Sequence, residues 1–449
     1  MTGSDNVDEF VRELNVGDVP GEIVRQARLC LLDTIGVAFA GSRTPMSHMM
    51  RDHVVEHYAS AARGARLLAD GRRASLIGVA LAGAATVDSM DGHDGHDLTK
   101  GHAGAAVIPA LLAFADTQAE PTSGAELLTR LIIGYEIGIR AGIALHTTAA
   151  DYHASGAWNA LAAAAVGART LKLDPAGTRH ALGIAEFHGP RSPMMRCIDH
   201  PTMVKDGSAA GAGVGVEAAL LAARGFTGAP AATLQAAGTE EIWADLGTRW
   251  RIAEQYRKPY PVCRWAHPAI QAALTLATEH HQRPEDVDTV EVTTFHQATR
   301  LATIHPATTE QAQYSLPFTI AVALTHREIH PDHLSGASLT DARILRLADR
   351  TTLREDAELT RAFPARRVAR LRIGLRDGQI LTSPDTTARG GPDEPRTESE
   401  LHATFTRYTE PVIGTEDSAA VAYLVDTVGN LASVHHLLDT LHRPTTRTC

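Results

Sequence analysis

Residues 88–110 concentrate side chains that can bind a metal ion or transfer protons. The segment reads DSMDGHDGHDLTKGHAGAAVIPA and supplies His93, His96, His102, Asp88, Asp91, Asp94, Asp97 and Lys100. Imidazole nitrogens and carboxylate oxygens are ligands for zinc and iron, and the same groups act as general acids and bases near neutral pH. The histidines lack the H-E-x-x-H spacing, which needs one continuous helix, and glycines interrupt the segment. The segment alone leaves a metal site, an acid/base site and a solvated loop as open interpretations.

Three later segments place further histidines and cations beside helices of small residues. They contribute His153, Arg196, Lys205, Lys258, Arg264 and His267. Lys205 precedes a helix rich in alanine and glycine, where a positive charge opposes the helix macrodipole. An anionic ligand therefore explains this lysine better than helix stability does. For His153, a histidine at a helix end is an alternative interpretation, and for residues 258–267 an ordinary basic linker is one.

The sequence lacks the motifs of common cofactor sites and nucleophiles. GAGVGVE at 211–217 has the spacing G-x-G-x-G and follows no predicted strand, so it predicts close helix packing and not a dinucleotide site. We find no P-loop, no G-x-S-x-G elbow and no cysteine nucleophile motif. Histidines with lysines and arginines suit proton transfer next to a carboxylate, because the cations stabilise the charge that develops there. This inventory indicates cofactor-free acid/base chemistry on a small polycarboxylate.

Composition narrows the class of protein and its partners. The chain has 449 residues, a net charge of −10 and 44% hydrophobic residues, which is enough for two domains. It has no basic stripe of the kind that binds nucleic acid, and its smoothest apolar stretch, at 157–168, is shorter than the ~20 residues of a membrane helix. The acidic start MTGSDNVDEF resembles no signal or transit peptide. The four cysteines, at 30, 197, 263 and 449, form no C-x-x-C pair, so we expect a cytoplasmic protein.

Helical periodicity gives way to strand patterns after the first half of the chain. Alanine-rich helical blocks fill most of the region before residue 260. Residues 286–295 then alternate like a half-buried strand. Residues 368–384 predict a hairpin, with its turn at Asp377–Gly378.

The C-terminal part returns to helix. Thr397 and Glu400 have the spacing of a capping box, which opens a new helix. The order of patterns predicts a mainly α protein in which an α+β segment is inserted into a helical domain. We expect a large all-helical domain that is discontinuous in sequence, 1–258 with 402–449, and a smaller α+β domain at 259–401.

The sequence resembles the MmgE/PrpD family over nearly the whole chain. The matching motifs, in chain order, are LLDTIGVAFAG, SMDGHD, GHAGAAVIPALLA, GYEIGIRAG, YHASGAWNALAAAAVGARTLKLD, MVKDGSAAGAG, KPYPVCRWAHPAIQAAL, YSLPFTIAVAL and GGPDEPRTESEL. The family includes 2-methylcitrate dehydratase, cis-aconitate decarboxylase and iminodisuccinate epimerase. The resemblance implies a large helical domain with a smaller α+β lid, usually in a homodimer. It also implies an active site between the domains that needs no metal and no organic cofactor.

Matched position by position, the resemblance assigns roles to the polar clusters. The catalytic positions that it implies are Asp91, His102, His153, Lys205 and His267. For substrate binding the resemblance implies Arg264 and Lys258, and the polar clusters themselves add Lys100, His93 and Arg196 as candidates. The segment GHDGHDLTKG at 92–101 differs from the better-known members, so we expect it to help select the substrate.

The resemblance and the residues together predict a lyase, with a dehydratase of a hydroxylated di- or tricarboxylic acid as the leading hypothesis. His102 would be the main acid/base group, and Asp91 would orient a neighbouring imidazole. Lys205 and Arg264 would hold carboxylates and stabilise the carbanion. The same residues could serve a decarboxylase of a cis-aconitate-like acid or an epimerase of an iminodisuccinate-like acid. A binding protein on a former enzyme scaffold and a metalloenzyme are the remaining alternatives.

Overall fold

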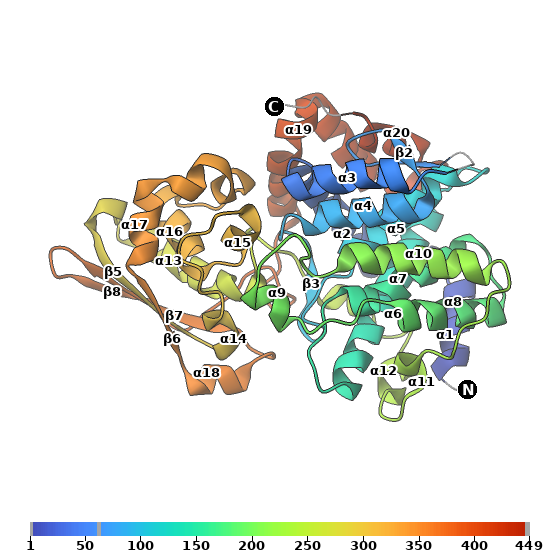
Figure 1. Cartoon of the computed structure of the whole chain (residues 1–449), viewed down its shortest axis with the longest axis horizontal. Coiled ribbons are helices and arrows are strands. Elements are labelled where there is room, and N and C mark those ends of the chain that lie inside the picture. Colours follow the sequence, from blue (N-terminus) through green and yellow to red (C-terminus); the bar gives the residue numbers. More distant parts are fainter. Residues whose placement is uncertain (1–2, 61–63, 445–449) are drawn as a thin grey trace.

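The computed structural model describes residues 3–60 and 64–444. Figure 1 shows a larger helical part, which holds the N-terminus and the C-terminal helices, beside a smaller part that carries the main sheet. One cluster of buried apolar side chains draws on residues 7–252 and 405–441. A second cluster draws mainly on residues 262–381. No helix among the described residues is long and apolar enough to cross a membrane.

The larger part is built from helices that pack directly on one another. They are α1 (Gly3–Glu13), α2 (Gly21–Gly41), α3 (Pro45–His57), α4 (Leu76–Asp88), α5 (Gly104–Thr117), α6 (Gly124–Thr148), α7 (Gly156–Thr170), α8 (Pro175–His188), α9 (Met195–Asp199), α10 (Ser208–Ala222), α11 (Ala232–Gln235), α12 (Glu240–Ala244), α19 (Glu398–Asp426) and α20 (His435–Leu441). Two pairs of two-residue strands lie between them, β1 (Ala65–Arg66) with β2 (Arg73–Ala74), and β3 (Gly95–His96) with β4 (Gln255–Tyr256).

Small residues let α7 and α10 approach closely. A Cβ atom added to Gly215 would lie 2.3 Å from the carbonyl oxygen of Ala160, and one added to Gly211 would lie 2.6 Å from that of Gly156. Such distances are far inside van der Waals contact, so these positions need glycine. The GAGVGVE segment is therefore a helix-packing element, as predicted.

The smaller part combines a sheet with short helices. Its helices are α13 (His267–Glu279), α14 (His296–Thr299), α15 (Thr309–Gln313), α16 (Leu316–His326), α17 (Ala342–Asp349) and α18 (Ala357–Ala362). Its strands are β5 (Val287–Thr294), β6 (Thr351–Glu355), β7 (Val368–Leu375), β8 (Ile380–Thr382) and β9 (Thr386–Thr387). The strand order is β6-β5-β7-β8, with β9 also on β7, and only the β5–β6 pair is parallel.

The local predictions for this region are confirmed. β7 and β8 form the predicted hairpin, and Gly378 in its turn has φ +92°, which favours glycine. Thr397 caps α19 through the predicted capping box with Glu400, and α19 packs on α2 of the first part. The fold is thus mainly α, with a discontinuous helical part and a smaller α+β part. The larger part is not all-helical as predicted, because it also contains the two short strand pairs β1–β2 and β3–β4.

Candidate active site

A short strand pair fixes the histidine-rich segment between α4 and α5. β3 lies antiparallel to β4, and His96 Nε2 lies 3.0 Å from Glu254 Oε2. A Cβ atom on Gly95 would lie 2.3 Å from the Tyr256 hydroxyl and 2.9 Å from His102 Nδ1. Glycine at this position therefore lets the two strands meet and brings the imidazole against them. The segment is buried, which rules out the solvated-loop interpretation.

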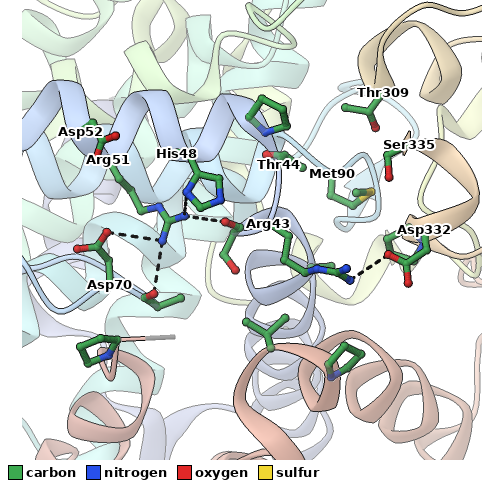
Figure 2. A pocket seen from close by; sticks show the side chains of 18 of the residues that line it. Arg43, Thr44, His48, Arg51, Asp52, Asp70, Met90, Thr309, Asp332 and Ser335 are labelled. Carbon is green, nitrogen blue, oxygen red and sulfur yellow. Dashed lines mark hydrogen bonds and ion pairs between the residues drawn. The ribbon is translucent and has the colours of Figure 1, made fainter. Parts of the chain in front are cut away.

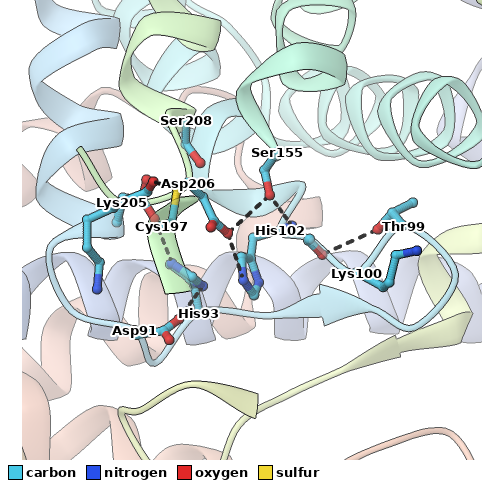
Figure 3. Close-up of polar contacts among 12 residues, drawn as sticks. Asp91, His93, Thr99, Lys100, His102, Ser155, Cys197, Lys205, Asp206 and Ser208 are labelled. Atoms are coloured by element: carbon cyan, nitrogen blue, oxygen red, sulfur yellow. Dashed lines mark hydrogen bonds and ion pairs between the residues drawn. The ribbon is translucent and has the colours of Figure 1, made fainter. Parts of the chain in front are cut away.

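Both ring nitrogens of His102 lie close to oxygen atoms. Its Nδ1 lies 2.6 Å from the carbonyl oxygen of Asp94, and its Nε2 lies 3.2 Å from Asp206 Oδ2 (Figure 3). A carbonyl oxygen only accepts, so Nδ1 carries the hydrogen of the first contact, while Nε2 faces a carboxylate. Ser155 Oγ also donates to Asp206 Oδ2, over 3.2 Å. This arrangement holds a buried imidazole between a backbone carbonyl and a carboxylate.

His93 packs against His102, and its surroundings favour the uncharged imidazole. The two ring centroids are 4.1 Å apart, and His93 Nε2 lies 3.2 Å from Asp88 Oδ1. Burial, and then the charges of His102 and Lys258, hold the pKa of His93 well below its ordinary value. Its Nδ1 has no hydrogen-bond partner among residues 3–60 and 64–444. This Nδ1 lies 3.8 Å from Asp91 Oδ1. His93 is therefore a neutral imidazole, which can accept a proton.

Asp91 forms a buried ion pair with Lys258. Lys258 Nζ lies 2.5 Å from Asp91 Oδ1, and both side chains are at most 2% exposed. Burial by itself raises the pKa of Asp91, but the ammonium groups of Lys258 and then Lys205 outweigh it and hold that pKa below its usual range. Asp91 is a carboxylate, and Lys258 is its counterion.

Lys205 is a buried cation that faces no carboxylate. Its Nζ donates to Gln313 Oε1 over 2.8 Å and lies 4.6 Å from the ring centroid of Tyr314. In the part of the chain that the structure describes, no carboxylate oxygen lies within ion-pair distance of this ammonium. Gln313 Oε1 also accepts from the backbone N–H of Asp91, over 2.9 Å. One amide from the smaller part thus joins the two ends of the cluster, and the uncompensated ammonium suits a carboxylate ligand.

Two family models cover most of the chain. The MmgE/PrpD N-terminal domain matches residues 6–245, and the MmgE/PrpD C-terminal domain matches residues 260–428. The chain belongs to the MmgE/PrpD family.

Curated relatives of this MmgE/PrpD protein align along almost their whole length. A cis-aconitate decarboxylase-like protein of Aspergillus oryzae is 24% identical, over 96% of this chain and 95% of the relative. The cis-aconitate decarboxylase of Aspergillus terreus is 23% identical, over 97% of this chain and 95% of the relative. The human cis-aconitate decarboxylase is 22% identical, over 97% and 93%.

The site of this family member also draws on the start of its smaller part. His267 is fully buried, and its Nε2 lies 3.0 Å from the carbonyl oxygen of Val262. Burial, and then the charges of Arg264 and Lys258, hold the pKa of His267 well below its ordinary value. Arg264 packs over the ring of Tyr256, with its Cζ 4.5 Å from the centroid. Tyr256 in turn meets His102 edge-on, at a centroid distance of 6.5 Å.

Two predicted site residues are not in direct contact with this cluster. His153 Nδ1 lies 2.8 Å from the carbonyl oxygen of Asp151, and its side chain is partly exposed. Arg196 is exposed, and its Nη1 lies 3.5 Å from Ser192 Oγ. Lys100 is closer to the cluster, with its Nζ 4.4 Å from the ring centroid of Tyr152. The roles of His153 and Arg196 stay predictions.

Three buried ligand atoms come close enough together to be weighed as a metal site. Donor atoms of Asp91, His93 and His102 lie within 4.8 Å of one another. However, Asp91 is paired with Lys258, His102 Nδ1 is bonded to the Asp94 carbonyl, and His102 Nε2 faces the Asp206 carboxylate. His93 Nδ1 has no hydrogen-bond partner among the described residues. A metal cation would have to compete with the Lys258 ammonium for Asp91 and break the His102–Asp94 hydrogen bond to use Nδ1, so the donor set fits a divalent metal poorly.

A polar cavity of about 770 Å³ adjoins the cluster from the side of α3 and α19 (Figure 2). Met90, which lines it, directly precedes Asp91. Thr309 also lines it, and its hydroxyl accepts from Gln313 Nε2 over 2.9 Å. Thr309 thus links this cavity to Gln313, which accepts the hydrogen bond from Lys205. Across it, Arg43 Nη1 forms an ion pair with Asp332 Oδ1 at 3.0 Å, which joins the two parts of the molecule.

Sequence reasoning missed several residues that complete the cluster. They are Asp206, Gln313, Tyr256 and Ser155. Asp206 follows Lys205 directly, and Ser155 lies two residues after His153, so both lie inside the family motifs. Gln313 gives no local signal, because its importance comes only from contacts with residues more than a hundred positions away.

Proposed function

We propose that this protein is a cofactor-independent lyase that decarboxylates a small tricarboxylate of the cis-aconitate type. The observation that carries the proposal is the position of His102, whose Nε2 faces the Asp206 carboxylate in the same cluster as the Lys205 ammonium, so this imidazole can serve as a proton donor. Decarboxylation with protonation of a neighbouring carbon needs a proton donor at rest, whereas dehydration starts with a base that removes a proton. The names of the curated relatives point the same way. Decarboxylation thus takes precedence over the dehydration that sequence reasoning ranked first.

In the proposed reaction, Lys205 binds one substrate carboxylate and His102 protonates carbon. The C–C bond to the leaving carboxylate breaks and its electron pair forms a new double bond. The pair of the old double bond takes the proton from His102 Nε2, and CO2 departs. The Nε2–Asp206 contact of 3.2 Å is long for a charge-assisted hydrogen bond, so this N–H can turn to a substrate. Water then restores the proton to the imidazole.

Replacing His102 tests this role directly. For the purified His102→Gln protein with cis-aconitate, we expect CO2 release to fall at least about 100-fold in kcat, because a positioned general acid contributes about 10²–10⁴-fold. The matched control is His435→Gln, since His435 is exposed at the start of α20. His102→Gln with wild-type CO2 release and an unchanged unfolding curve would contradict the proposal.

Dehydration is a second candidate, and the free Nδ1 of His93 favours it. A neutral buried imidazole beside Asp91 can remove a proton α to a carboxylate, as dehydration and epimerisation require. A panel of 2-methylcitrate, citrate, malate and iminodisuccinate, scored for water loss, CO2 release and loss of chirality, separates the reactions. Water loss that depends on His93, without CO2 release from cis-aconitate, would make the protein a dehydratase. Binding of these acids without turnover of any would make it a binding protein.

We also propose the organisation that the family resemblance implies. The helical domain would comprise 1–258 with 402–449, the inserted domain would comprise 259–401, and the protein would act as a cytoplasmic homodimer. Light scattering on the purified protein tests the dimer. Limited proteolysis tests the boundaries, because cleavage is expected first in exposed backbone at domain junctions.

A further inference from the structure

A second group of cations lies around Tyr256, next to the acid/base cluster. The Cζ of Arg264 lies 4.5 Å, and that of Arg367 5.7 Å, from the Tyr256 ring centroid. Both arginines are at least nine-tenths buried. His102 meets the same tyrosine ring. The two guanidinium groups therefore lie close to the proton donor, although Arg367 comes from the chain just before β7.

These cations outnumber the carboxylates around them. Arg264 donates only to backbone carbonyls, from Nη1 to Arg389 over 2.6 Å and from Nη2 to Ala388 over 3.1 Å. Its Nε has no hydrogen-bond partner among the described residues. Arg367 pairs with Asp97, whose Oδ1 lies 2.6 Å from Nη1. Buried positive charge without a matching anion is costly, so this group of cations suits a negatively charged ligand.

Lys100 adds a third cation at this end. Its ammonium lies over the Tyr152 ring and has no carboxylate within ion-pair distance among residues 3–60 and 64–444. Burial and the charge of Arg367 lower its pKa. Figure 3 shows Lys100 and Lys205 on opposite sides of His102. A ligand with several carboxylates could thus be held at both ends, with its reacting carbon next to the imidazole.

The one carboxylate in this group differs from its partner in exposure. The side chain of Asp97 is 43% exposed, whereas that of Arg367 is 6% exposed. The guanidinium is fixed in the interior, but the carboxylate can turn into water at little cost. Replacing one carboxylate by another keeps the buried guanidinium paired, so the exchange avoids the penalty of an isolated charge.

We propose that Arg367 and Arg264 form a carboxylate-binding subsite, and that Asp97 occupies it as an internal counterion until a ligand carboxylate displaces it. This inference deepens the proposed function and rests on its polycarboxylate substrate. The segment GHDGHDLTKG acquires a specific role, because its Asp97 sets how easily a carboxylate enters the subsite. Arg367 becomes a specificity-determining residue that lies outside the sequence motifs.

The subsite is tested by calorimetric binding of tricarballylate, an unreactive tricarboxylate, to the full-length protein. We expect Asp97→Asn to tighten binding at least about 3-fold, because the competing carboxylate is gone. We expect Arg367→Gln to weaken binding at least about 10-fold, because it removes a charged partner. Arg370→Gln is the matched control, since Arg370 lies three residues further along, in β7, and its side chain pairs with the exposed Asp385. This variant should stay within about twofold of wild type.

The gain expected for Asp97→Asn protects the test against misfolding, because a damaged protein does not bind more tightly. Weaker binding by Asp97→Asn, unchanged binding by folded Arg367→Gln, or no binding by the wild type would each overturn the subsite. The proposed reaction is scored separately by CO2 release. If the wild type releases CO2 but Arg367→Gln binds tricarballylate as the wild type does, the subsite proposal is wrong and the lyase proposal stands. The expected binding pattern without turnover would keep the subsite and remove the decarboxylase.

Discussion

At the scale of single residues, burial assigns the charge states on which the chemistry depends. His93 and His267 are buried without a carboxylate strong enough to keep them charged, and their pKa values lie well below the ordinary one. Asp88 is buried beside His93, and burial raises its pKa. Asp91 keeps its charge because Lys258 lies against it. Groups with pKa values pushed apart in one cleft are the usual signature of an acid/base site.

The Asp91–Lys258 pair should be strongly interdependent. Lys258→Met leaves a buried carboxylate without its counterion, so we expect a loss of about 3–5 kcal/mol in the free energy of unfolding, measured with urea at pH 7. Because the folded pKa of Asp91 is depressed, its contribution to stability is present above the ordinary carboxylate pKa and is lost as pH falls below it. The difference between wild type and Lys258→Met should therefore shrink in acid. An equal difference at pH 7 and at low pH would contradict this account.

At the scale of helices, Glu136 in α6 predicts a pH dependence of opposite sign. Burial raises the pKa of Glu136 to about 7. The Arg140 guanidinium lowers this pKa but does not cancel the effect of burial. Arg140 pairs with Asp245 as well as with Glu136. A raised folded pKa contributes stability that is present below the unfolded pKa and is lost as pH rises through the folded value. When the pH is raised from 5 to 7, the free energy of unfolding should fall in wild type by ~2 kcal/mol more than in Glu136→Gln. Parallel urea titrations of the two proteins measure this difference.

The α7–α10 contact predicts opposite effects of two alanine substitutions on one helix. Gly215→Ala places a Cβ 2.3 Å from a backbone oxygen of α7, so we expect a loss of about 1–3 kcal/mol from overpacking. A Cβ on Gly213 would lie 3.5 Å from its nearest neighbour, Leu81. Gly213→Ala should therefore be neutral, or stabilising by about 0.5–1 kcal/mol, because alanine favours helix. Thermal unfolding of both variants measures the two effects. An equal loss of stability in Gly215→Ala and Gly213→Ala would contradict the packing argument.

The elements that sequence could predict are those whose signals are local. The Asp377–Gly378 hairpin and the Thr397–Glu400 capping box depend on residues a few positions apart, and both form as predicted. The contacts that complete the site join distant segments. Arg367 reaches Asp97 across 270 positions, and no local pattern reports such a meeting. Family motifs supplied Asp91, His102 and Lys205, but their partners became visible only in three dimensions.

At the scale of the whole molecule, two polar contacts between the parts of the chain differ in their expected importance. The Arg43–Asp332 pair is exposed, with side chains 46% and 69% accessible, so it should add about 0–1 kcal/mol. Gln313 is fully buried and holds both Asp91 and Lys205. Gln313 belongs to α15 of the smaller part, so the site is complete only when α15 packs against the larger part. Formation of the site therefore depends on the contact between the two parts.

Gln313→Glu tests that coupling through charge and leaves the shape of the side chain unchanged. The glutamate keeps an oxygen for the Asp91 N–H but gives Lys205 an internal counterion, so the ammonium no longer attracts a substrate carboxylate. We expect KM for the turned-over acid to rise at least about 10-fold, because the recruiting charge is neutralised. Asp332→Ala at the same junction is the control and should change KM less than about twofold. If Gln313→Glu folds and keeps the wild-type KM, Lys205 is not the carboxylate ligand.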